Sequence, residues 1–303
     1  MRDAIRAGLG ASPKTLPPSL FYDSRGAALF EQITALPEYY PTRTEAAILE
    51  RHAGDLADLM GARVAMIEPG SGAATKVRRL LSAMHDPVAY VPVDVAREQL
   101  LDVAEECAME FPRVTVTPVW ADYSHGITLP PLPDRARRVV FFPGSTIGNL
   151  HPHEASAFLH RMRELVGREG GMVLGVDRRK DPRILNAAYN DAAGVTAEFN
   201  LNMLVHLNRE FRGTFDRTRF VHRAFFADAE SRIEMHLEAV VPHRVQVAGE
   251  EFTFAKGETI RTEVSYKYDR ARLDDVARAG GWRVQQLFTD ENAWFWVVWL
   301  RPE

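Results

Sequence analysis

Hydrophobic and polar positions in the middle of the chain alternate between short apolar runs and longer segments with helical spacing. The apolar runs lie at 63–68, 89–93, 114–119, 138–142 and 172–176, and the helical segments lie at 76–84, 97–109 and 153–166. Strands that alternate with helices form a parallel sheet with right-handed crossovers. The pattern therefore predicts an α/β protein with a doubly wound sheet.

The two ends of the chain follow other patterns. The first forty residues are rich in proline, with a helix-like stretch at 25–36, and indicate an arm or cap before an amphipathic helix at 44–60. Residues 181–194 look helical, and alternation within 220–247 predicts antiparallel strands of a second region. The last apolar runs, 282–287 and 294–300, predict a terminal hairpin. A parallel sheet that ends in such a hairpin is typical of the Rossmann-like S-adenosylmethionine (SAM) methyltransferase fold.

Composition narrows the class of protein. The chain has 303 residues, of which 46% are hydrophobic, enough for one large or two ordinary domains. Its net charge is −4, and neither sign forms a long block, so we expect no nucleic-acid partner. The single Cys107 cannot form an internal disulfide, and no apolar run approaches the ~20 residues of a membrane span. We expect a soluble, cytoplasmic protein with no membrane partner.

A glycine-containing loop follows the first predicted strand. Gly70 and Gly72 would lie at the carboxyl edge of the sheet, where small residues let a ligand approach the backbone and helix amides bind an anion. Asp94 follows the second strand and is placed to accept hydrogen bonds from ribose hydroxyls. These features together predict a cofactor that contains adenosine.

The loop favours SAM over a dinucleotide. Thr75 stands where a dinucleotide motif has its third glycine, and a short loop suits a cofactor without pyrophosphate. Asp122 and Tyr123 follow the third strand, where a carboxylate and a backbone amide can meet adenine. A nicotinamide-dependent oxidoreductase stays an alternative, as does a loop packed for structural reasons alone.

The fourth strand leads to Asn149 at the same edge. An asparagine amide both donates and accepts, so Asn149 could bridge cofactor and substrate, although it could equally cap the next helix. His151, His153 and Glu154 could bind a metal ion, but the spacing places no further ligand, and we expect none. The tryptophan-rich run at 294–299 is expected in the core, and no hydrolase motif occurs.

Six sequence blocks in one order resemble the ergothioneine-pathway histidine Nα-methyltransferases. They run from about Leu20 to the end of the chain: Phe21-Tyr-Asp-Ser-Arg-Gly26, Leu36-Pro-Glu-Tyr-Tyr-Pro-Thr-Arg43, Tyr90-Val-Pro-Val-Asp94, Ser145-Thr-Ile-Gly-Asn149, Ala193-Gly-Val-Thr-Ala-Glu-Phe-Asn200 and Arg261-Thr-Glu-Val-Ser265. The resemblance implies a SAM-binding domain over 44–179 and 268–303. It also implies a smaller α+β substrate domain over 1–43 and 180–267.

The resemblance also implies roles for individual cofactor-binding residues. Gly70 and Lys76 would bind the methionine part of SAM, and Asp94 the ribose. Asp122 and the backbone of Tyr123 would bind adenine. Two positions depart from the family pattern, namely Pro69 inside the glycine loop and Tyr123 where phenylalanine is expected. Neither change removes a functional group.

For the substrate, the resemblance implies that Asn149 and Tyr189 bind the histidine carboxylate. Tyr39 would line the pocket beside the α-amine, and Tyr22 would approach that amine through water. Glu263 and Ser265 would hydrogen-bond the imidazole, with Met235 packed near the ring. A carboxylate can accept a hydrogen bond from the imidazole N–H, which makes Glu263 the decisive position for specificity.

The expected activity is stepwise methylation of L-histidine to its Nα-trimethyl derivative (hercynine) by a monomeric enzyme. Relatives that act on other amino acids, notably tryptophan, share most of the cofactor blocks. The same chemistry on another amino acid therefore stays an alternative, and so does a SAM-binding protein without turnover.

Overall fold

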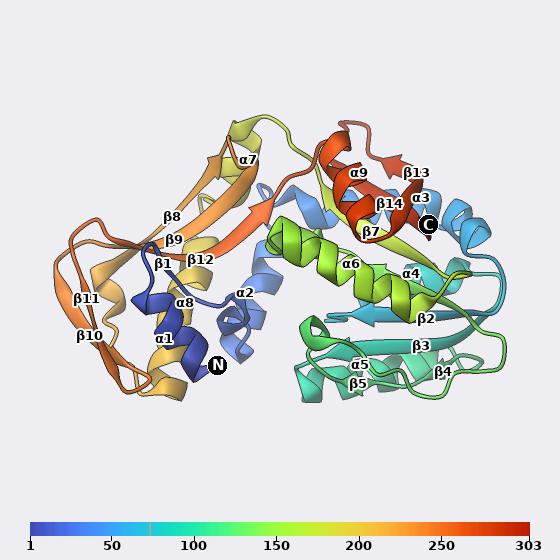
Figure 1. Ribbon diagram of the computed structural model, residues 1–303, viewed down its shortest axis with the longest axis horizontal. Helices are drawn as coiled ribbons and strands as arrows, with labels where there is room; N and C mark the ends of the chain where they lie inside the picture. Colours follow the sequence, from blue (N-terminus) through green and yellow to red (C-terminus); the bar gives the residue numbers. More distant parts are fainter. Residues whose placement is uncertain (73) are drawn as a thin grey trace. The chain divides into compact units, whose positions relative to one another are not determined.

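A computed structural model describes residues 1–72 and 74–303, with His125 described by its backbone alone. The chain divides into two compact units (Figure 1). The large unit comprises Pro41–Arg179 and Tyr268–Glu303, and the small unit comprises Met1–Tyr40 and Lys180–Lys267. The sequence placed the first boundary three residues later, between residues 43 and 44.

The large unit contains a mixed sheet in the order β13-β14-β7-β6-β2-β3-β4, with β5 also paired to β3. All its strands run parallel except β14, which is antiparallel to both neighbours. The expected parallel sheet with a terminal hairpin is therefore confirmed. The strands are β2 (Val64–Pro69), β3 (Pro87–Asp94), β4 (Thr115–Val116), β5 (Val119–Trp120), β6 (Arg137–Phe142), β7 (Gly171–Asp177), β13 (Trp282–Thr289) and β14 (Phe295–Pro302).

The chain order of these strands creates a switch point beside β2. From β2 the chain moves outward to β3, β4 and β5, and then returns to β6 on the other side of β2. Ligands of open α/β sheets bind beyond the carboxyl ends of the strands at such a reversal. The loop after β2, which contains Gly70, lies at this point.

Helices cover both faces of this sheet (Figure 1). Apolar side chains of α3 (Tyr40–Met60), α4 (Thr75–Ala83) and α5 (Arg97–Glu110) form one core with the strands. On the other face, α6 (Pro152–Val166) packs beside α9 (Arg270–Ala279). Two short 3-10 helices, η2 (Tyr123–His125) and η3 (Thr146–Asn149), follow β5 and β6 at the carboxyl edge.

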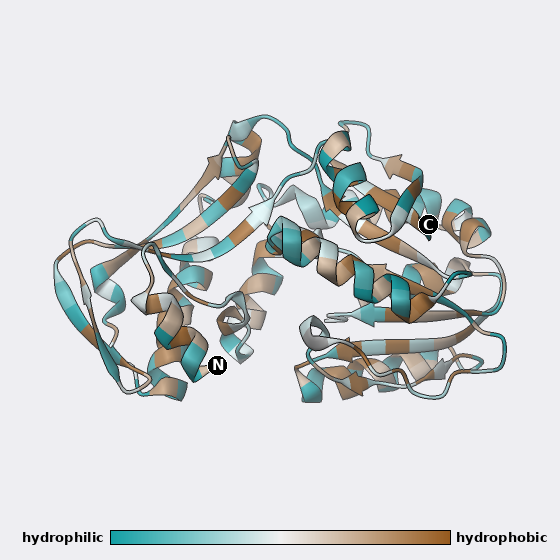
Figure 2. Ribbon diagram, viewed as in Figure 1, coloured by the Kyte–Doolittle hydropathy of each residue, from teal (hydrophilic) through white to brown (hydrophobic). Residues whose placement is uncertain are grey.

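Hydropathy follows this layering. The inner strands of the large unit are mostly hydrophobic, whereas α6 alternates between apolar and polar residues (Figure 2). The expected core position of the tryptophan-rich run is confirmed by Phe295, Trp296 and Trp299, which are buried. Among the described residues, no helix has both the length and the apolar composition needed to cross a membrane.

The small unit is built on a second sheet, in the order β1-β12-β9-β8. Helix α8 lies against β8 and β9, and α2 lies against α8. The helices are α1 (Arg2–Gly10), η1 (Pro18–Phe21), α2 (Ser24–Thr34), α7 (Pro182–Ala188), α8 (Val195–Phe211) and η4 (Arg217–Arg219). The strands are β1 (Lys14–Thr15), β8 (Phe220–Ala227), β9 (Arg232–Ala239) and β12 (Thr259–Tyr266), with a separate hairpin of β10 (His243–Val247) and β11 (Glu250–Phe254).

Three local predictions were wrong. The arm expected at the amino terminus contains α1, which buries Ile5 and Leu9. The helix expected over 181–194 ends already at Ala188 in α7. A longer, unpredicted helix starts at Val195, directly after Gly194, which has a positive φ of 75°. The strand expected over 114–119 is split into β4 and β5, since Pro118 has no N–H to continue the ladder.

Candidate active site

The ring of Tyr123 packs against the glycine loop after β2. Gly70 has a φ of +71°, and a Cβ atom at this position would lie 3.3 Å from the Tyr123 ring. The same ring packs edge-on against Phe142 of β6 and Phe158 of α6. Burial raises the pKa of Tyr123 to about 12, so the phenol stays neutral. Tyr123 thus packs as a hydrophobic side chain, as the phenylalanine expected there would.

The expected ribose and adenine carboxylates lie at the ends of β3 and β5, which are neighbouring strands. Asp94 accepts hydrogen bonds from the backbone N–H of Gly72 at 3.2 Å and of Ala96 at 2.9 Å. Asp122 accepts one from the backbone N–H of Ser124 at 2.9 Å and thereby caps η2. The large unit therefore brings Gly70, Gly72, Asp94 and Tyr123 together, with Asp122 at the same edge.

Lys76, in the first turn of α4, is held by a carboxylate that the sequence did not reveal. Glu45 of α3 is only 1% exposed, accepts from the Lys76 ammonium, and accepts from the backbone N–H of Gly144 at 2.9 Å. A Cβ atom on Gly175 would lie 2.0 Å from this carboxylate, so the glycine in β7 makes room for it. Glu45 thus connects α3, α4 and the turn after β6.

The loop also contains polar groups suited to a bound cofactor. The hydroxyl of Ser71 is buried and has no hydrogen-bond partner among the described residues. In the neighbouring strands β2 and β3, the Tyr90 hydroxyl donates to Glu68 at 2.6 Å, and burial raises the pKa of Glu68 to about 8. An unpaired hydroxyl, an accessible glycine backbone and the Asp94 carboxylate fit a cofactor that carries both a carboxylate and a ribose.

Asn149 is the last residue of η3 and is half-buried. The turn before it is fixed by Ser145, which has a φ of +55° and accepts a hydrogen bond from the backbone N–H of Asp177. Helix α6 begins three residues after Asn149, and Glu154 in its first turn accepts from the backbone N–H of His151 at 2.7 Å. Glu154 therefore caps a helix here. Among the described residues, no three His, Cys, Asp or Glu side chains are grouped as metal ligands.

The small unit gathers the predicted tyrosines around one aromatic cluster. Tyr22 and Tyr39 both pack edge-on against Phe30, at centroid distances of 6.0 and 6.3 Å. Tyr39 also packs edge-on against Tyr189 at 6.3 Å. Tyr22 is 52% exposed, whereas Tyr189 is buried. Phe30, which the sequence did not single out, thus holds two of the predicted residues in place.

Strand β12 carries the residues expected to bind the imidazole. Glu263 lies directly opposite Met235 of β9, and Ser265 lies two residues further along the same face. Burial raises the pKa of Glu263 to about 7, and the positive charge of Lys267 acts in the opposite direction. This face therefore presents a carboxylate, a hydroxyl and a thioether side by side.

A buried hydrogen-bond network supports Tyr189 and β12. The imidazole of His222 bonds to the backbone carbonyl of Tyr189 at 2.9 Å and to the side chain of Asn200 at 2.9 Å. Asn200 is fully buried, and it accepts from the hydroxyl of Thr262 and donates to the backbone carbonyl of His236. Burial lowers the pKa of His222, so this imidazole is neutral. The network links α8 to β8, β9 and β12.

Lys267 is the functional candidate that sequence reasoning missed in the small unit. It follows Glu263 and Ser265 at two-residue spacing, so the alternation of a strand would have placed all three side chains on one face. Glu45 and Asn200 gave no comparable signal, because a polar residue in an amphipathic helix normally faces solvent.

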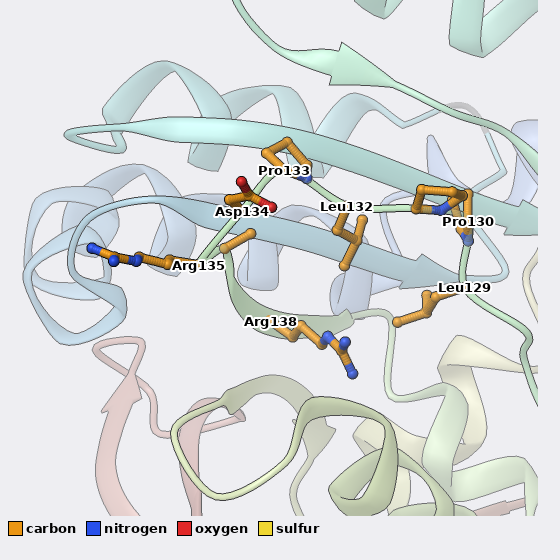
Figure 3. A pocket seen from close by; sticks show the side chains of 9 residues that line it. Leu129, Pro130, Leu132, Pro133, Asp134, Arg135 and Arg138 are labelled. Carbon is orange, nitrogen blue, oxygen red and sulfur yellow. The ribbon is translucent and has the colours of Figure 1, made fainter.

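The large unit also has a shallow hollow away from the glycine loop (Figure 3). It is lined by the loop from Leu129 to Arg138, which leads into the amino end of β6. The glycine loop and Asp94 lie at the carboxyl ends of the parallel strands, at the opposite edge of the sheet. The hollow is therefore separate from the candidate site.

The fold is that of the SAM-dependent methyltransferases. The structure resembles the crystal structure of a S-adenosylmethionine-dependent methyltransferase from Clostridium acetobutylicum, with a TM-score of 0.50 and 9% sequence identity. The match covers 92% of this chain and 98% of that one. At this identity the likeness concerns the fold alone.

Sequence comparison identifies the family. The model of the histidine-specific, SAM-dependent methyltransferases matches residues 1–302, and the chain belongs to this family. It is 41% identical to the histidine N-alpha-methyltransferase of Mycolicibacterium smegmatis, over 96% of this chain and 91% of that protein. It is also 31% identical to ergothioneine biosynthesis protein 1 of Neurospora crassa, over 78% of this chain and 29% of that longer protein.

Proposed function

We propose that this protein transfers methyl groups from SAM to the α-amine of L-histidine, giving Nα-trimethylhistidine (hercynine), a step of ergothioneine biosynthesis. The observation that carries this proposal is that Glu263 and Ser265 lie on one face of β12, with Glu263 opposite Met235. A carboxylate that accepts and a hydroxyl that donates match the N–H and the unprotonated nitrogen of an imidazole.

The large unit is proposed to bind the cofactor. Asp94 holds the ribose hydroxyls, Asp122 and the Tyr123 backbone hold adenine, and Gly70 with Lys76 holds the methionine part. The ammonium of Lys76 has three donors, so it can bind a ligand carboxylate as well as Glu45. When bound, SAM supplies an electrophilic methyl group on a sulfonium.

The substrate side combines residues from several elements. Tyr189 and Asn149 bind the histidine carboxylate, and Tyr39 lines the pocket beside the α-amine. Tyr22 contacts the amine through water and passes its proton to solvent, because an α-ammonium has no lone pair for attack. The aromatic faces of Tyr22 and Tyr39 also tolerate the growing quaternary ammonium cation. We expect Tyr22→Phe to lower the rate and change its pH profile.

The remaining expectations belong to the same proposal. The enzyme needs no metal, acts as a monomer on a free amino acid, and binds no nucleic acid, in keeping with its net charge of −4. Its single cysteine is buried and unpaired, which is consistent with a cytoplasmic location. Methylation of tryptophan by the same fold, and SAM binding without turnover, are the competing functions.

The test follows methyl addition by mass spectrometry, with purified protein, SAM and a panel of L-histidine, L-tryptophan and L-tyrosine. We expect trimethylated histidine, lost in Glu263→Ala and retained in the matched control Glu251→Ala, which alters an exposed carboxylate on β11. Methylation of tryptophan instead would overturn the assigned specificity. Binding of S-adenosylhomocysteine without any product would favour the non-catalytic alternative.

A further inference from the structure

Lys267 is a buried lysine whose side chain lies on the substrate-binding face of the small unit. It is 1% exposed and directly follows β12. Its backbone N–H donates to the carbonyl of Ser231 at 2.8 Å, and its carbonyl accepts from the Ser231 hydroxyl at 3.0 Å. These bonds continue the strand by one residue, and side chains two residues apart point to the same face of a strand.

The ammonium of Lys267 joins two residues of the proposed substrate site. Its Nζ atom donates to Ser265 Oγ at 2.9 Å and to Tyr189 Oη at 3.2 Å, and it lies 5.1 Å from the centre of the Tyr189 ring. Tyr189 comes from the segment after α7, whereas Ser265 lies in β12. Lys267 therefore fixes the distance between a proposed carboxylate-binding group and a proposed imidazole-binding group.

The direction of these hydrogen bonds has a chemical consequence. An ammonium has three N–H donors and no acceptor, so both hydroxyl oxygens must accept from it. A hydroxyl that accepts from an ammonium keeps its own hydrogen for donation to another group. Ser265 and Tyr189 are thereby set to act as hydrogen-bond donors.

We propose that Lys267 is a specificity-determining positioning residue, which makes Ser265 a hydrogen-bond donor to the substrate ring beside the acceptor Glu263. This inference rests on the proposed function and names the ligand form that the site selects. The pocket then offers one acceptor and one donor, which a neutral imidazole satisfies with its N–H and its bare nitrogen. An indole has only the N–H, and a phenyl ring has neither, so each leaves a buried polar group unpaired.

The experiment compares the kinetics of Lys267→Met, Ser265→Ala and the double variant with those of the wild-type protein. We expect Lys267→Met to lower kcat/KM for L-histidine on the order of 10- to 100-fold, mainly through KM. In the wild-type background, Ser265→Ala should lower kcat/KM for L-histidine by a similar factor. In the Lys267→Met background it should lower kcat/KM only slightly, because Ser265 then no longer donates in a fixed direction. The matched control is Lys256→Met, an exposed lysine in the turn after β11.

Urea unfolding followed by circular dichroism reports whether each variant is folded, including its small unit, and Lys267→Gln serves as a second variant if Lys267→Met does not fold. Independent, multiplicative effects of the Lys267 and Ser265 substitutions would overturn the inference, as would an unchanged KM for histidine. A wild-type protein that does not methylate histidine would instead contradict the proposed function. The two failures are therefore distinguishable.

Discussion

At the scale of single residues, burial sets the chemistry of the candidate site. Glu263 and Glu68 both have pKa values raised by burial, to about 7 and about 8, while ordinary carboxyls titrate near 4.5. The sequence indicated Glu263 through the family resemblance, yet nothing in the sequence reveals its protonation. That property depends on the residues packed around the carboxyl group, including Lys267.

The raised pKa of Glu263 predicts a specific pH dependence of stability. Between pH 4.5 and 7 the native state binds more protons at this site than the unfolded state, so its contribution to stability falls as pH rises. From pH 5 to pH 8 we expect the unfolding free energy of Glu263→Gln to increase relative to wild type, by about 3 kcal/mol at most. Urea denaturation at the two pH values measures this difference.

The fixed effects of the substitution, such as the loss of a partner for Lys267, cancel in that comparison because they are present at both pH values. Glu251→Gln, on the exposed surface of β11, is the control and should show no such change. A constant difference between wild type and Glu263→Gln would show that this carboxyl titrates normally.

At the scale of elements, periodicity identified most strands and helices of the large unit but less of the small one. In the large unit, buried strands are nearly continuous apolar runs, such as β2 and β7, in which every residue is buried. Helix α8 was missed because Asn200 and Asn202 interrupt its apolar stripe, although both are buried. The buried side chain of Asn200 is hydrogen-bonded to three partners on other elements, and no local sequence pattern predicts these bonds.

Asn200→Ala should therefore destabilise the small unit strongly. The substitution removes one hydrogen bond each from the hydroxyl of Thr262, the carbonyl of His236 and one nitrogen of His222 in a buried site. The Thr262 hydroxyl keeps its bond to the backbone carbonyl of Met235 at 3.1 Å. We expect a loss of about 2–4 kcal/mol in unfolding free energy. Asn190→Ala, which removes an exposed side chain that bonds two backbone carbonyls, is the control and should cost less than about 1 kcal/mol. Equal losses would contradict the role of the network.

At the scale of the whole molecule, the predicted site residues are divided between the two units. The cofactor residues and Asn149 belong to the large unit, whereas the tyrosines, Met235, Glu263 and Ser265 belong to the small unit. The small unit is assembled from two distant segments of the chain, 1–40 and 180–267. Cofactor binding is thus expected to depend on the large unit, and recognition of the substrate ring on the small unit.

This division predicts which substitutions affect cofactor affinity. Asp94→Ala should weaken binding of S-adenosylhomocysteine on the order of 10- to 100-fold, because it removes a charged acceptor for the ribose hydroxyls. Ser265→Ala should leave that affinity within about twofold while weakening histidine binding. Isothermal titration calorimetry with each ligand measures both. A large loss of S-adenosylhomocysteine affinity in Ser265→Ala would argue against the division of roles.

The sequence alone determined the α/β sheet, its terminal hairpin, the glycine loop and Asp94, because these follow from local periodicity and from residues at strand ends. The tertiary structure alone decided which partners the buried polar groups bond to. Lys76 is bonded to Glu45 31 residues away, Asn200 to Thr262 62 residues away, and Lys267 to Tyr189 78 residues away. Periodicity states which face of an element is buried, but the partner on that face is fixed only when distant elements pack together.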